Sequence, residues 1–103
     1  MESLSRGFLA PWEPLPPDRA TAFQSELERE LSAGHPLHGV AVHAVARSRR
    51  GDDALFQLED GRVADVHLTW SSKGERIPWP THHIYTSLDE WQRHVMIPAH
   101  EEL

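Results

Sequence analysis

Two alternating apolar segments joined by an acidic turn, ALFQLEDGRVADVHLTW, constrain this chain more than any other stretch of its sequence. A two-residue turn, DG, would place Phe56 opposite Asp65 and mix apolar with charged side chains on one face. A three-residue loop over residues 59–61, with Gly61 left-handed, shifts the register by one and places Phe56 opposite Ala64. One face then becomes uniformly apolar, which favours this loop and its glycine bulge. That predicted face contains Phe56, Leu58, Ala64, Val66, Leu68 and Trp70.

A helix is predicted before this hairpin, over residues 18–33. Apolar residues recur every four positions at Phe23, Leu27 and Leu31, which gives one buried stripe. The charged residues between them, Glu26, Arg29 and Glu30, are assigned to the solvent side. Gly34 and Pro36 end the helix.

The remaining elements complete an α+β fold. GVAVHAVARSRR predicts a strand before the hairpin, and HHIYT predicts a short fourth strand after it. Ser87 followed by Glu90 forms a capping box that begins a last helix, which Pro98 ends. We expect an N-terminal helix, a three- to four-stranded antiparallel meander and a C-terminal helix, with both helices on one face of the sheet. Residues 1–17, rich in proline, are assigned to an N-terminal arm, and residues 18–103 to a single domain.

Three of the four tryptophans lie within residues 66–91. Trp70 continues the apolar face of the hairpin, and Trp91 shares a helix face with Leu88 and Val95. Both are predicted to be core residues. Trp79 lies between two prolines, where an anchor for the loop and an exposed contact are both open readings.

Charge and composition narrow the classes of partner. The net charge is −6, so the chain as a whole repels a phosphate backbone, and nucleic-acid binding is not expected. No apolar run reaches membrane-spanning length, and Phe8–Ala10 is too short an apolar core for an export signal. The chain has no cysteine, which is compatible with the cytoplasmic location we expect.

The stretch VHLTWS, a loop that ends in WP, and YTSLDEW followed by a methionine resemble a group of small uncharacterised bacterial proteins of about this length. The resemblance runs from LPPDRA, near residue 15, to the tail. It implies a bacterial, cytoplasmic, single-domain protein. No activity, cofactor or catalytic residue carries over from it.

The eight histidines raise the possibility of a chemical site. His43 and His67 share the outer face of the sheet in the predicted register, with Asp65 beside them, and a two-histidine, one-carboxylate metal site can be drawn there. His82 and His83, next to Trp79, form a second concentration. No established metal spacing, nucleophile elbow or phosphate loop is present, so no catalytic residue and no cofactor is assigned.

The outer face of the sheet is the predicted interaction surface. With both helices on the other face, Val45, Leu55 and Val63 would lie exposed beside His43 and His67, and Trp79 is a further candidate contact. The expected function is therefore a non-catalytic protein-interaction module, immunity-like or regulatory, which binds another protein or forms a homodimer through this face. The alternative is a small histidine-using enzyme or a metal-binding protein.

Overall fold

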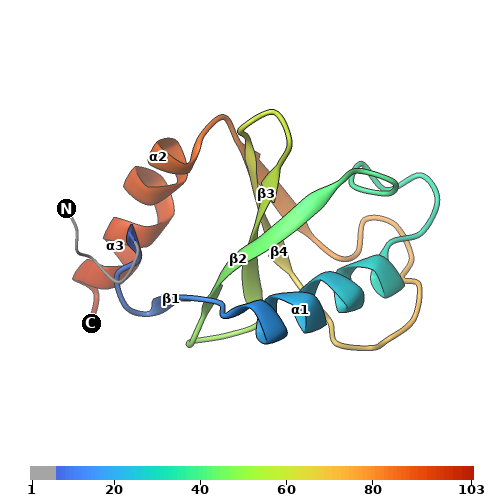
Figure 1. Ribbon diagram of the computed structural model, residues 1–103, viewed down its shortest axis with the longest axis horizontal. Coiled ribbons are helices and arrows are strands. Elements are labelled where there is room, and N and C mark those ends of the chain that lie inside the picture. The colour runs from blue at the N-terminus through green and yellow to red at the C-terminus, as the bar shows by residue number, and fades with distance from the viewer. Residues whose placement is uncertain (1–6) are drawn as a thin grey trace.

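The computed structural model describes residues 7–103 as an antiparallel sheet with helices on both sides (Figure 1). The five strands lie in sequence order, so the sheet is a meander. The sequence predicted three or four strands, and the structure has one more than the larger number. The elements are β1 (Trp12–Pro14), α1 (Pro17–Glu30), β2 (Val42–Ser48), β3 (Asp53–Leu58), β4 (Val63–His67), β5 (His82–Tyr85), α2 (Leu88–Trp91), the π-helix η2 (Gln92–Met96) and α3 (Ile97–Glu101).

The predicted hairpin register is confirmed. Phe56 pairs with Ala64, and Ala54 pairs with Val66. The loop between the strands is residues 59–61, closed by a bond from the Leu58 N–H to the Arg62 carbonyl, and Gly61 has a φ of +94°. A side chain at this φ would be strained, which is why glycine stands here.

The extra strand comes from the segment assigned to an arm. Residues 12–14 form β1 and pair with residues 46–48 of β2, so this part of the arm belongs to the sheet. Pro14, Pro16 and Pro17 then end the ladder, because proline has no backbone N–H to donate. Pro17 begins α1 at a position where the missing N–H costs nothing. The first part of the predicted arm, residues 1–6, lies outside the described residues.

The expectation that both helices share one face of the sheet is wrong. Phe56 packs with Phe23 and Leu27 of α1, whereas its neighbour Leu55 packs with Trp91 of α2. Successive residues of a strand point to opposite faces, so α1 and the C-terminal helices cover opposite faces of the sheet, as Figure 1 shows. The sheet is the middle layer of three.

The C-terminal helical segment begins as predicted and ends later. The Ser87 hydroxyl accepts the Glu90 N–H at 3.1 Å, as in a capping box. Pro98 does not end the segment, and α3 continues to Glu101. The backbone is a π-helix before Pro98, with the Ile97 N–H bonded to the Gln92 carbonyl. This wider turn precedes a proline that has no N–H for the regular ladder.

Candidate interaction groove

The outer face of the sheet is covered rather than open. Leu55 and Val63 are buried beneath Trp91 and Met96, and Val45 is partly buried in the same cluster. The predicted interaction surface is therefore wrong for Leu55 and Val63, because the C-terminal helices lie where solvent was expected. A homodimer through this face loses its basis. Trp79 alone among the predicted contacts is well exposed, at 46%.

The predicted metal site is not assembled. His67 lies opposite Asp53 on β3, whereas His43 lies opposite Gln57, four residues further along the same strand. The His67 Nδ1 instead meets Asp53 Oδ1 at 2.7 Å. Within residues 7–103, no group of three or more histidine, aspartate or glutamate side chains could hold a metal ion.

The prediction that Asp65 lies on an exposed face of the sheet is wrong. Asp65 lies partly buried under α2, and its Oδ2 accepts the indole N–H of Trp91 at 3.0 Å. Burial raises the pKa of Asp65 to about 7 against this hydrogen bond, and the charge of nearby Asp53 adds to the rise. Asp53, Asp65 and His67 line a shallow hollow of about 350 Å³, together with His83 opposite Asp65.

Trp70 is a surface residue and not the core residue that the sequence predicted. β4 ends at His67, and the chain turns into the left-handed region at Trp70, with a φ of 58°. The Trp70 ring remains 41% exposed and packs edge-to-face on Phe23, 5.0 Å between ring centroids. The prediction that Trp91 is core is confirmed, since its side chain is fully buried.

The cause of this turn is a pair of buried glutamates that the sequence assigned to the solvent side of α1. Glu30 accepts the backbone N–H groups of Thr69 and Trp70 at 2.9 and 2.7 Å. Glu26 accepts the N–H of Ser72 at 2.9 Å. Burial raises the pKa of Glu30 to about 7, and the neighbouring Glu26 carboxyl adds to the rise. The two carboxyl groups thus connect the loop after β4 to α1 by hydrogen bonds.

The remaining open surface is a groove between α1 and the free edge of β2. β1 covers only residues 46–48 of β2, and the Leu15 N–H adds one bond to the Val45 carbonyl. On the edge opposite β3, no strand within residues 7–103 lies beside residues 42–44. The three prolines at the end of β1 therefore leave the first half of β2 without a neighbour on this side.

Main-chain groups of β2 that face away from β3 line the floor of this groove. The Ala44 N–H points away from β3, because it donates to the side-chain oxygen of Gln24 on α1 at 2.9 Å. Groups two residues apart point the same way in an antiparallel strand, so the N–H and C=O of Val42 also face the free edge. The groove thus presents strand-edge donors and acceptors in an apolar setting.

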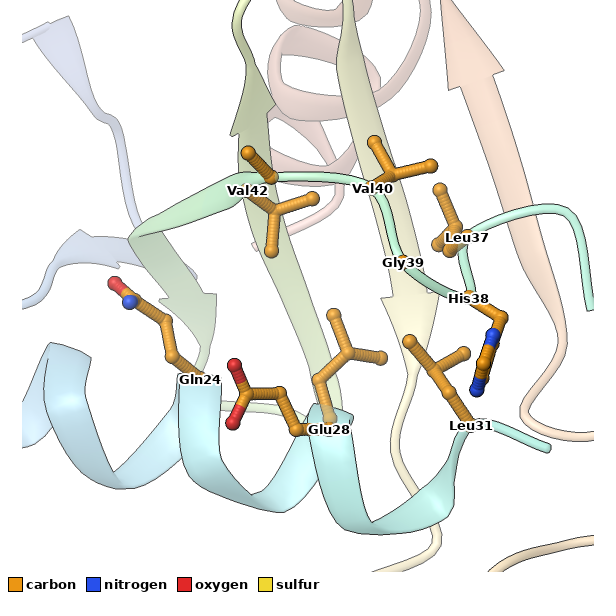
Figure 2. A pocket seen from close by; sticks show the side chains of 10 residues that line it. Gln24, Glu28, Leu31, Leu37, His38, Gly39, Val40 and Val42 are labelled. Atoms are coloured by element: carbon orange, nitrogen blue, oxygen red, sulfur yellow. The ribbon is translucent and has the colours of Figure 1, made fainter. Parts of the chain in front are cut away.

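The walls of the groove are mainly apolar. Figure 2 shows Leu31, at the end of α1, projecting toward Leu37 on the facing loop, and Val42 on the strand pointing toward the helix. Val40 also lines this hollow. The hollow between Leu31 and Val42 measures about 550 Å³. A second hollow of about 620 Å³ lies on the other side of Gln24, next to the prolines at positions 14, 16 and 17. Both volumes are within the usual range for ligand sites.

The charged groups at the groove are acidic. Glu28 lies on its α1 side, and Glu59 lies beside Val42 in the adjoining hollow. His38 and His43 also line these hollows, and no lysine or arginine does within the described residues. One feature of the sequence does indicate the groove: the prolines at positions 14, 16 and 17 forbid a long β1.

Comparison of the chain with known protein families, curated proteins and solved structures gives no match. The resemblance drawn from the sequence patterns accordingly stays a prediction. Within residues 7–103, each helix is too short or too polar to cross a membrane.

Proposed function

We propose that this protein is a non-catalytic protein-interaction module and that its binding surface is the groove between α1 and β2. The observation that carries the proposal is an open strand edge beside a wall of leucine and valine side chains. Main-chain groups at such an edge give affinity, and the neighbouring pockets give specificity. The expected immunity-like or regulatory role would act through this groove and not through the covered outer face.

A library of random octapeptides displayed on phage tests the proposal with two matched variants. Val40 in the groove and Ile97 in α3 are 39% and 38% exposed, so aspartate should be tolerated at both positions. We expect the wild type and Ile97→Asp to enrich the same peptides, and Val40→Asp to lose them. Thermal melting of each variant checks the fold. Peptides that bind all three proteins equally would place the surface elsewhere, and a library that yields no binder would count against the proposal.

A second candidate is supported by the hollow at the end of β4. The carboxylate of Asp53 orients His67, and Asp65, with a pKa of about 7, lies on the same face of the sheet. Such an arrangement suits general acid–base chemistry. A panel of chromogenic esters and phosphate esters tests it against the variant His67→Ala. Turnover by the wild type that this variant loses supports the candidate, and equal rates reject it.

A further inference from the structure

We infer that the groove takes an extended segment of a partner protein as an added strand, with apolar side chains toward α1 and basic side chains on the opposite face, toward Glu59. This inference rests on the proposed function and specifies the partner. It concerns the chemistry and direction of the bound segment.

The main chain defines the mode of binding. Val42 and Ala44 direct their edge groups into the groove, and Gln24 already satisfies one of them as a neighbouring strand would. A helix has no free main-chain groups along its side, so a bound helix would leave the edge unpaired at a cost in free energy. An extended segment pairs with these groups and displaces the Gln24 side chain.

A second copy of this chain is a poor occupant for a steric reason. The side chain of Gln24 reaches from α1 to β2, so the helix stands directly beside the strand edge. One extended chain fits between them, but the edge of another complete sheet brings its own helices. Edge-to-edge dimers need an edge that is open to both sides.

The direction of the bound segment relative to β2 follows from β1. This strand runs antiparallel to β2 on the same edge and stops at Pro14, so a bound segment that continues its line is also antiparallel. In that arrangement, the residue opposite Val42 shares its face and exchanges both main-chain bonds with it. Val42 packs toward the α1 side of the sheet, so the apolar residues of the segment carry the bonded N–H groups.

Charge complementarity selects the alternate residues. Glu59 lies beside Val42 and His43 in the adjoining hollow, and the whole chain has a net charge of −6. Side chains alternate along an extended segment, so one set points toward α1 while the other shares the face of His43 and points toward this hollow. Lysine or arginine in the second set is favoured over aspartate or glutamate.

The probe is an acetylated heptapeptide in which lysine and valine alternate. It is titrated into the 15N-labelled protein, and binding is followed by NMR. We expect binding in the groove, with slower hydrogen exchange at the amides of Val42 and Ala44. The matching peptide of glutamate and valine should bind more weakly. Glu59→Lys should weaken the lysine peptide about two- to fivefold, as expected for an exposed ion pair.

N-methylated peptides provide the decisive control, because the protein itself is unchanged. Methylation of the valine amides should weaken binding at least about tenfold, through loss of the strand-edge bonds. Methylation of the lysine amides should leave affinity nearly unchanged. Loss on lysine methylation instead would overturn the antiparallel direction.

The outcomes separate this inference from the proposed function. If library-selected peptides require Val40 but neither protect the Val42 amide nor respond to N-methylation, the groove binds by another mode and only the inference fails. Concentration-dependent dimers that vanish in Val40→Asp, seen by analytical ultracentrifugation, would show a second copy as occupant and also overturn it.

Discussion

At the scale of single residues, two tryptophans that the sequence assigns to the core differ in burial. Trp70 was expected to continue the alternation of β4, but the strand ends three residues earlier because Glu30 draws the backbone N–H groups of the loop toward α1. Trp91 is enclosed by Phe8 and Trp12, with edge-to-face contacts at centroid distances of 5.9 and 4.8 Å. The alternation of β4 could not predict the exposure of Trp70, because the loop after β4 is bonded to a helix that is distant in sequence.

Replacing these two tryptophans should therefore have unequal effects. Trp91→Ala should lower the free energy of unfolding by about 3–5 kcal/mol, as expected for a fully buried aromatic side chain. Trp70→Ala should cost about 1 kcal/mol, because its edge-to-face contact with Phe23 is the main interaction lost. Urea denaturation followed by circular dichroism measures both. Similar losses would contradict the different environments of the two rings.

The buried glutamates give a second prediction at the residue scale. Glu30→Ala should cost about 1–3 kcal/mol, because the partly buried hydrogen bonds from the N–H groups of Thr69 and Trp70 lose their acceptor. Their hydrogen exchange should accelerate, which NMR can follow amide by amide. Glu28→Ala is the matched control, since this exposed glutamate lies on the same helix. An equal effect of the two substitutions would mean that the loop is held by other contacts.

At the scale of elements, the β3–β4 hairpin could be predicted from local sequence, whereas the position of the C-terminal helices could not. Gly61 and the apolar alternation define the register within one short stretch. The run Ala54–Leu55–Phe56 is apolar at successive positions, a pattern typical of a strand buried on both faces. That pattern contradicted an open outer face, but it does not identify which helix covers each side.

The turn at Gly61 can be tested with a matched glycine. Gly61→Val should cost about 1–2 kcal/mol, because a β-branched residue resists a positive φ. Gly51→Val is the control, since an added Cβ meets nothing within 4 Å at either glycine and only Gly61 has a positive φ. Denaturant unfolding of the two variants gives the comparison. Equal stabilities would show that the backbone at residue 61 adapts without strain.

At the scale of the whole molecule, the three-layer arrangement changes which chemistry is accessible. The second apolar cluster, around Trp91, encloses the partly buried Asp65. The groove, by contrast, combines residues from α1, the following loop and β2, which are consecutive in the chain. Its apolar members were recognisable as a helix stripe and a strand, but their convergence beside an unpaired edge depends on where β1 stops.

Stability should depend on pH through Asp65. The folded protein keeps this proton up to about pH 7, whereas an unfolded aspartate releases it near pH 4. The folded state therefore binds more protons between these values, and its stability falls as pH rises through this window. Asp65→Asn removes the ionisable group but keeps an oxygen that can accept the Trp91 N–H.

The expected result is a difference between pH 5 and pH 8. At pH 8, Asp65→Asn should melt about 4–8 °C above the wild type, which corresponds to about 1 kcal/mol in a domain of this size. At pH 5, the two proteins should melt at similar temperatures. Thermal scans at both pH values provide the measurement. A constant gap at both pH values would show that the ionisation of Asp65 does not control this part of the stability.

The proline segment that leaves β2 uncovered also limits polymerisation. An exposed, flat strand edge can recruit identical strands and seed fibrils. Here only the first half of β2 is free, α1 stands beside it, and Gln24 occupies the Ala44 N–H. Prolines 14, 16 and 17 prevent β1 from sealing the edge, yet they also make the neighbouring backbone a poor template for strand growth. The free strand edge can thus persist at high concentrations of this protein without conversion to a fibril.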